Sequence, residues 1–187
     1  MTRSGKSPKA HLLLLRCQTL LPSPLDPSLD VAYQNAYALF HSGKYSAAIK
    51  TADKVLLKDP QHYKALNIKG IALCFSDNFT DGMRNIDASL SIAPGFGYAR
   101  FNKALAYSYN KRFDEALHWY DSALSVENYV WSHYGKAAIY GQKNDVTNAV
   151  KNLKIAIEMD KGVKDVAKGE KDFNPVRNSK EFKELVQ

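Results

Sequence analysis

The sequence predicts an all-α fold, an α-solenoid in which antiparallel helix pairs stack into a right-handed superhelical array. Three observations predict it: a repeat of about 34 residues, helical spacing of apolar residues inside each copy, and a small residue at the same place in each copy. The small residues are Ala48, Gly82, Ala116 and Ala149, at intervals of 34, 34 and 33 residues. Repeats of this period form stacked units with a continuous surface, which is typical of binding scaffolds rather than of enzymes.

Residues 1–27 precede the repeats and differ from them in composition. This segment holds four basic residues against Asp26 alone, a net charge of +3 out of the +7 of the chain. The basic residues are Arg3, Lys6, Lys9 and Arg16. The remaining +4 is spread over the repeats, whereas nucleic-acid binding needs basic residues gathered on one face. We therefore expect no nucleic-acid partner.

The leucine run in this segment, Leu12–Leu15, is shorter than the roughly 7–15 apolar residues of a secretory signal, and Arg16 follows it directly. We interpret residues 1–27 as a basic, proline-rich tail that is disordered or loosely docked. The alternative is a degenerate export or membrane-association signal. No run of about 20 apolar residues, the length of a membrane span, occurs in the sequence.

The cysteine content bears on location. The chain has two cysteines, Cys17 and Cys74, which supply no disulfide framework and suit a reducing compartment. We therefore expect a cytoplasmic protein, with export or membrane association through the N-terminal segment as the alternative.

Residues 28–161 are expected to form four helical hairpins. Their first helices start near Leu29, Tyr63, Gly97 and Val130. In each unit, two stretches with apolar residues at i, i+3, i+4 and i+7 flank a turn that holds polar residues or glycine. Pro60 and Pro94 close the first two units, because proline cannot continue a helix.

Small residues mark the expected contact between the two helices of each unit. Position 8 of the units holds Ala36, Gly70, Ala104 and Ala137, and the residues of the 34-residue series occupy position 20. Antiparallel helices approach closely only where a side chain is little larger than a methyl group, so we expect the helices to cross here. Enlarging Ala48 or Ala116 should overpack the crossing at about 1–3 kcal/mol. Gly82 lies inside a helix, where glycine is unfavourable, so unit two is expected to be the loosest.

This pattern resembles the tetratricopeptide repeat, with Ala or Gly at positions 8 and 20, Tyr or Leu at 11, a large apolar residue at 17, and Ala at 27 in units three and four. The resemblance covers about residues 29–161 in four in-phase copies. Unit three departs from it with Asn128 where the family has proline, and Arg100 and His133 stand where the family prefers tryptophan. The resemblance implies a concave face lined by the first helix of each pair.

Residues 162–187 are expected to close the array with a capping helix and a closing segment. Residues 164–171 can form a helix, residues 172–179 interrupt it, and Ser179 can cap a last turn over residues 181–186. This run resembles the C-terminal closure of many bacterial and archaeal tetratricopeptide proteins. The residues expected to cover the apolar end of the stack are Phe173, Val176, Phe182 and Leu185.

Catalytic and metal-binding motifs are missing from the sequence. Gly95-Phe96-Gly97 lacks the third glycine and the preceding strand of a nucleotide-binding loop, and no phosphate loop, GxSxG or HExxH occurs. The five histidines include no i, i+4 pair suited to a metal. We therefore expect no enzyme activity, no cofactor and no metal.

The candidate functional surface is the stripe at positions 2, 5, 9 and 12–13 of the first helices, which the resemblance places on the concave face. Aromatic side chains are frequent interface anchors because they bury much area with little loss of rotamer entropy. The candidate partner-binding residues are Tyr33, Tyr37, Asn67, Tyr98, Phe101, Tyr109, Trp131 and Tyr134. The alternative is that several of these rings pack inside the array or under residues 1–27.

We expect a protein–protein interaction module that binds a segment of another protein in this groove. The alternative is a subunit that self-associates into a homo-oligomer and organises a larger assembly. One kind of partner is not expected. Tetratricopeptide domains that hold the acidic tails of heat-shock chaperones use Lys, Arg and Asn side chains, and no cation stands at those positions here. The residues present are Tyr33, Tyr37, Ile68, Tyr98 and Asn102.

Overall fold

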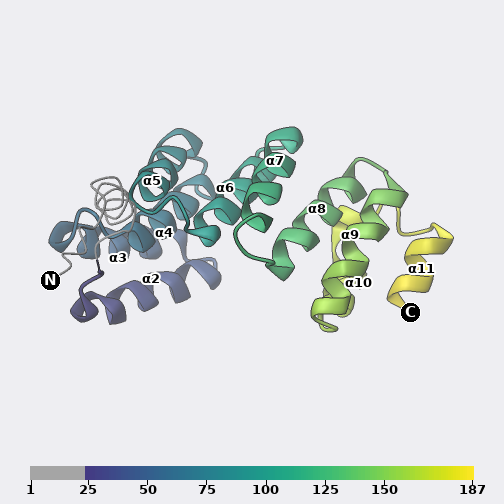
Figure 1. Cartoon of the computed structure of the whole chain (residues 1–187), viewed down its shortest axis with the longest axis horizontal. Helices are drawn as coiled ribbons and strands as arrows, with labels where there is room; N and C mark the ends of the chain where they lie inside the picture. The colour runs from purple at the N-terminus through teal and green to yellow at the C-terminus, as the bar shows by residue number, and fades with distance from the viewer. Residues whose placement is uncertain (1–23) are drawn as a thin grey trace, which may run out of the picture. The chain divides into compact units, whose positions relative to one another are not determined.

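The computed structural model describes residues 24–187, and within that range all regular structure is helical (Figure 1). The elements are η1 (Pro27–Leu29), α2 (Asp30–His41), α3 (Tyr45–Lys58), α4 (Tyr63–Cys74), α5 (Phe79–Ile92), α6 (Gly97–Tyr109), α7 (Phe113–Leu124), α8 (Val130–Gln142), α9 (Val146–Met159), α10 (Val163–Gly169), η2 (Lys171–Phe173) and α11 (Lys180–Val186). The predicted all-α fold class is confirmed. None of these helices is long and apolar enough to cross a membrane.

Most of the predicted N-terminal tail, residues 1–23, lies outside the described residues. Residues 24–26 of the tail are described and lead into η1, where Asp26 caps the first turn. The carboxylate of Asp26 accepts a hydrogen bond from the backbone N–H of Ser28 at 2.8 Å. Leu29 is then buried, at 4% exposed, so the packed part of the chain is already established where α2 begins.

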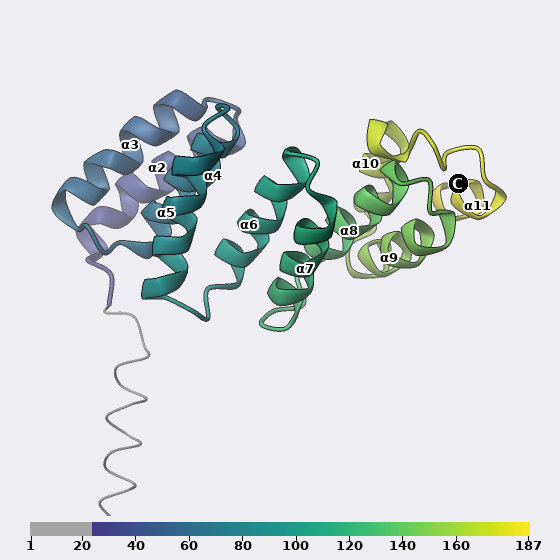
Figure 2. The ribbon, with the colours of Figure 1, turned by 90° about the horizontal axis from the view of Figure 1, so that it is seen from above.

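The described chain divides into two compact units, one ending at Gly95 and the other running from Phe96 to Gln187. In the N-terminal unit, α2 pairs with α3 and α4 pairs with α5, while α4 also contacts α2 and α3 (Figure 2). Helix α3 buries Ala48, Ala52 and Val55, which recur at intervals of four and three residues along one side of the helix.

Two glycines allow α4 and α5 to approach closely. A Cβ added to Gly70 would lie 2.7 Å from the backbone oxygen of Gly82, and a Cβ added to Gly82 would lie 2.6 Å from the backbone oxygen of Gly70. At the same place in the neighbouring hairpin, Ala36 and Ala48 are 0% exposed. The small residues of the repeat therefore stand where the paired helices touch.

The turn inside each helix pair has the same left-handed backbone conformation in all four pairs. The residues with positive φ are Gly43 (73°), Asp77 (61°), Lys111 (59°) and Asn144 (58°). The residue that follows each of them donates its N–H to the carbonyl five residues back, at 2.9, 3.0, 2.9 and 2.9 Å in chain order. This bond satisfies a carbonyl at the end of the first helix and sets the chain direction for the second.

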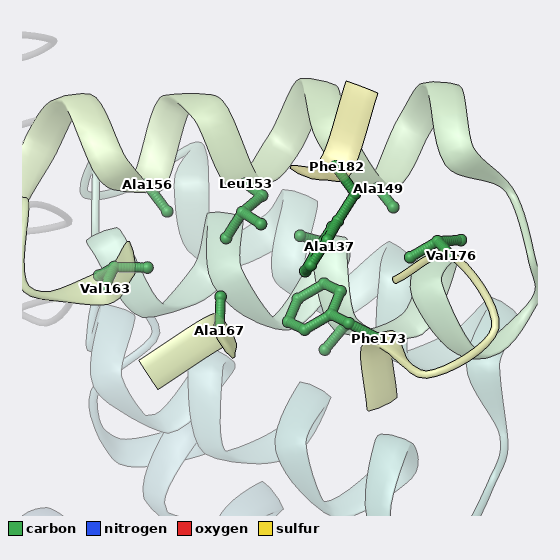
Figure 3. Close-up of a cluster of buried hydrophobic side chains, with 10 residues drawn as sticks. Ala137, Ala149, Leu153, Ala156, Val163, Ala167, Phe173, Val176 and Phe182 are labelled. Atoms are coloured by element: carbon green, nitrogen blue, oxygen red, sulfur yellow. The ribbon is translucent and has the colours of Figure 1, made fainter. Parts of the chain in front are cut away.

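The C-terminal unit contains the pairs α6–α7 and α8–α9, followed by α10, η2 and α11. Its closing segment packs on α8 and α9 through a buried apolar cluster (Figure 3). In this cluster Phe173 is 0% exposed and Phe182 is 1% exposed, and their ring centroids lie 5.3 Å apart. Ser179 caps α11, accepting a hydrogen bond from the N–H of Phe182 at 3.2 Å. Arg177 donates to the backbone oxygens of Lys168 and Glu170 and so joins the end of α10 to η2.

Candidate partner-binding face

Five of the candidate aromatic residues lie in the C-terminal unit, on the first helices of its two pairs. We call this set the aromatic face: Tyr98, Phe101 and Tyr109 of α6, and Trp131 and Tyr134 of α8. Residues three apart on a helix lie on the same side of it, which aligns Tyr98 with Phe101 and Trp131 with Tyr134. Helices α6 and α8 contact each other. All five side chains are at least partly exposed, and Tyr109 is exposed the most, at 49%.

Contacts between rings order the aromatic face. Tyr98 stacks on Phe101 with 6.0 Å between ring centroids and 16° between planes. Trp131 meets Tyr134 edge-on at 5.4 Å. Aromatic pairs of this kind contribute about 0.5–1.5 kcal/mol beyond their area burial. Four of the five rings, those of Tyr98, Phe101, Trp131 and Tyr134, are therefore held in pairs in the absence of a partner.

A buried tyrosine supports the aromatic face. The ring of Phe101 lies 5.9 Å from that of Tyr120 on α7. Tyr120 is 1% exposed and fits against Gly135 of α8, where an added Cβ would lie 2.3 Å from the ring carbon Cζ. Any larger residue in place of this glycine would displace Tyr120 from beneath Phe101.

The closing segment lies along the α8 side of the aromatic face. The ring of Phe173 lies 5.8 Å from that of Tyr134, and a Cβ added to Gly141 would lie 2.8 Å from the backbone oxygen of Asp172. Burial raises the pKa of the Tyr134 hydroxyl, and the negative charges of Glu170 and Asp172 raise it further. Burial also raises the pKa of the Asp172 carboxyl, and the negative charge of Glu170 adds to this effect. This side is thus acidic and partly desolvated.

The other three candidates lie in the N-terminal unit, and two of them are buried. Tyr33 is 7% exposed, its ring lies 5.8 Å from that of His62, and burial raises its pKa to about 12. Asn67 is 0% exposed, and its amide oxygen and nitrogen have no hydrogen-bond partner in the described part of the chain. Tyr37 is partly buried, with its ring 4.3 Å from that of His41. The candidates therefore form two sets, one on α2 and α4 and one on α6 and α8.

Sequence reasoning missed the acidic side of the aromatic face and the role of His62. Glu170 and Asp172 follow the repeats, so the spacing of the repeat gave no register that would place them beside Tyr134. His62 caps α4, where its Nδ1 accepts a hydrogen bond from the N–H of Ala65 at 3.1 Å. Histidine is not among the side chains that usually signal a helix start, which is why the capping was not expected.

Little else in the described residues suggests chemistry. Residues 24–187 contain no group of three His, Cys, Asp or Glu side chains arranged to hold a metal. Cys74 is 1% exposed, and burial raises the pKa of its thiol to about 12, which keeps it protonated. A hollow of about 420 Å³ lies between α9 and α11, and no residue of the aromatic face lines it. It is lined by Val146, Thr147, Val150, Lys151 and Glu181.

Comparison with known families identifies the repeat. The sequence profile of the tetratricopeptide repeat matches residues 98–129, which comprise most of α6, all of α7 and the loop before α8. This chain is a tetratricopeptide repeat protein. The fold of this family supports a protein–protein interaction scaffold.

Solved structures share the fold of this tetratricopeptide repeat protein at low sequence identity. MamA from Desulfovibrio magneticus RS-1 is 23% identical, with a TM-score of 0.57 over 70% of this chain and 75% of that chain. PilF of Pseudomonas aeruginosa is 15% identical, with a TM-score of 0.65 over 84% of this chain and 74% of that chain. A structure of Naa15/Naa10 bound to HypK-THB contains a chain that is 17% identical, with a TM-score of 0.61 over 84% of this chain and 24% of that one.

A curated relative is the N-terminal acetyltransferase A complex subunit-like protein of Schizosaccharomyces pombe, which is 28% identical over 87 residues. The aligned part is 46% of this tetratricopeptide repeat protein and 12% of the relative. The chain therefore spans only a small part of that relative's length.

Proposed function

We propose that this tetratricopeptide repeat protein is an interaction scaffold whose aromatic face receives a segment of a partner protein. The observation that carries the proposal is the gathering of five aromatic side chains on two contacting helices, with no charged residue at the other face positions. Those other positions hold Leu105, Ser108, Ala138, Gly141 and Gln142. Three or four anchors of about 2 kcal/mol each correspond to affinities around micromolar.

The names of two similar proteins support a role in assemblies. One solved structure has Naa15/Naa10 bound to HypK-THB, and the Schizosaccharomyces pombe relative is named as a complex subunit-like protein. In the N-terminal unit, the proposed contact is Tyr37, together with the buried Tyr33 and Asn67 of the same stripe. In this proposal the protein acts by holding partners and has no catalytic activity of its own.

A pull-down from native lysate with matched variants tests the proposal. The face variant carries Tyr98→Ala, Tyr109→Ala and Trp131→Ala, and it leaves Phe101 intact because that ring packs on buried Tyr120. The control variant carries Val126→Ala and Met159→Ala, two exposed apolar residues of the same unit, 45% and 40% exposed. We expect the face variant to lose captured proteins that the wild type and the control variant retain.

The outcome is interpreted only for folded variants, which circular dichroism establishes. Equal capture by the wild type and by a folded face variant would remove the aromatic face as the binding site. Retention on immobilised RNA or DNA that falls steeply with salt would instead indicate a nucleic-acid partner, which the proposal excludes.

Self-association is the second candidate function, and one observation favours it. Val31 and Leu57 of the N-terminal unit are 80% and 86% exposed, and an interface between two copies of the chain would remove both side chains from water. Light scattering over a range of concentrations measures the molar mass of the wild type and of a Leu57→Glu variant. A mass that rises with concentration in the wild type alone supports a homo-oligomer, and a constant monomer mass removes it.

The proposed location is the cytoplasm. Mass spectrometry of the protein purified from its native cells determines where the mature chain begins. A chain that has lost its first residues at a cleavage site would support export in place of the cytoplasm.

A further inference from the structure

The acidic side of the aromatic face has carboxylates without a cationic partner. Neither Glu170 nor Asp172 forms an ion pair with any residue between 24 and 187, although both are partly buried. Glu170 accepts a hydrogen bond from the backbone N–H of Lys171 at 2.8 Å, and within residues 24–187 no hydrogen bond involves the carboxylate of Asp172. Partly desolvated carboxylates that lack a cation favour the arrival of one.

The cation of the protein that acts on Asp172, Lys111, is already engaged elsewhere, and Arg177 is engaged by the backbone oxygens of Lys168 and Glu170. The charge of Lys111 favours the ionised form of Asp172, but its Nζ donates a hydrogen bond to the Oε1 of Gln142 at 2.7 Å. Lys111 therefore acts on Asp172 from a distance and leaves the carboxylate open to a second cation.

Aromatic rings border the same place. The ring of Tyr134 lies 5.4 Å from that of Trp131 and 5.8 Å from that of Phe173, centroid to centroid. A cation over the face of a tryptophan or tyrosine is attracted by the ring quadrupole, and a guanidinium can also stack on the ring. Rings and carboxylates thus favour the same kind of ligand.

We propose that the partner places an arginine or lysine side chain against Trp131 and Tyr134, with its charge directed at Glu170 and Asp172. This inference rests on the proposed function and adds the chemistry of the partner: an apolar segment with a basic residue that meets the α8 side of the aromatic face. Such a partner is opposite in charge to the acidic tails whose capture the sequence argues against.

Two short peptides that differ only in charge test whether binding depends on a cation. One is acetyl-Gly-Leu-Arg-Leu-Gly-amide, and the other has citrulline in place of arginine, which keeps the shape and removes the charge. Each is titrated into the ¹⁵N-labelled full chain while the indole N–H resonance of Trp131 is followed, after assignment with a Trp131→Phe variant. We expect the arginine peptide to bind about tenfold more tightly than the citrulline peptide, since a desolvated cation–π contact and a charge-assisted hydrogen bond each contribute on that scale.

Variants that remove carboxylate charges test whether Glu170 and Asp172 cause the preference for the arginine peptide. Glu170→Gln with Asp172→Asn keeps the size of both side chains, and we expect the preference for arginine to disappear. Glu158→Gln with Asp160→Asn, two exposed carboxylates of the same unit, is the control and should keep the preference. The inference is overturned by equal affinity for both peptides, by a preference that survives in the first variant, or by no movement of the Trp131 resonance with either peptide at millimolar concentration.

These outcomes are separable from those of the pull-down. Equal binding of both peptides at Trp131 removes the cation site and leaves the aromatic face in place. Capture of native partners that does not depend on the face removes the proposed function, whatever the peptides show.

Discussion

Replacing Gly82 by alanine sets helix propensity against packing, and the structure indicates which effect is larger. Alanine is favoured over glycine inside a helix by about 1 kcal/mol, so propensity alone predicts stabilisation. The new Cβ, however, would lie 2.3 Å from the Sγ of Cys74, 2.6 Å from the oxygen of Gly70 and 2.8 Å from the nitrogen of Cys74. Two of these three atoms belong to the backbone of α4, so relief requires the paired helices to separate.

The expected result for Gly82→Ala is a net loss of stability. Overpacking typically costs about 1–3 kcal/mol, and contacts with backbone place this site at or above the top of that range. After subtracting the propensity gain, we expect a loss of about 2 kcal/mol, which corresponds to a fall in Tm of roughly 4–8 °C for a chain of this size. Urea and thermal unfolding followed by circular dichroism measure both quantities.

Two further variants separate the causes. Gly169→Ala, at the end of α10, meets nothing within 4 Å and should leave the stability unchanged or slightly higher. Cys74→Ala combined with Gly82→Ala removes the sulfur but leaves the two backbone contacts, so only part of the loss should be recovered. A Gly82→Ala variant as stable as the wild type would refute the reasoning, because the helices would then tolerate the methyl group.

Three other predictions concern single side chains. Gly43→Ala should lower the free energy of unfolding by about 1 kcal/mol, because the site has positive φ and no atom within 4 Å of an added Cβ, so the backbone conformation alone is responsible. Burial lowers the pKa of His62, whose neutral Nδ1 caps α4. Its stabilising effect is therefore complete above the unfolded pKa near 6.5 and is lost as the pH falls from there through the lower pKa of the folded state. The unfolding midpoint of His62→Asn should depend less on pH near this range than that of the wild type, although two other histidines of lowered pKa, His41 and His133, still contribute there. The Cys74 thiol should resist iodoacetamide at neutral pH until urea unfolds the chain, as peptide mass mapping would show, and alkylation of native Cys74 would contradict its burial.

The helix pairs could be predicted from the sequence because the residues that determine them recur. The small residues at Gly70 and Gly82 identified the crossing of α4 and α5, and the structure places their backbones in contact. The predicted start of unit three, Gly97, is the first residue of α6. Phe173, Val176 and Phe182 have apolar spacing in the sequence and are buried in the structure, where they pack in one cluster with residues of α8 and α9.

The surroundings of the candidate side chains could not be predicted in the same way. Helical spacing gives the side of a helix on which Tyr33 lies, but its burial depends on His62, which comes from the loop before α4. Likewise, the neighbours of Tyr134 come from a segment without repeat register, so the carboxylates beside it had no counterpart in other units. Periodicity predicts direction along one helix, whereas the environment of a side chain depends on contacts between elements distant in sequence.

The turn that joins the helices of each pair has a consequence for how such a protein can change. Glycine, aspartate, lysine and asparagine occupy its left-handed position in the four pairs, with the same backbone hydrogen bond after each. Because main-chain atoms maintain this geometry, side chains there can vary in charge and size at a modest energetic cost. The tips at Gly43, Asp77 and Asn144 are therefore suitable places to attach a fluorophore or an affinity label without disturbing the packed helices, whereas Lys111 is held by its hydrogen bond to Gln142.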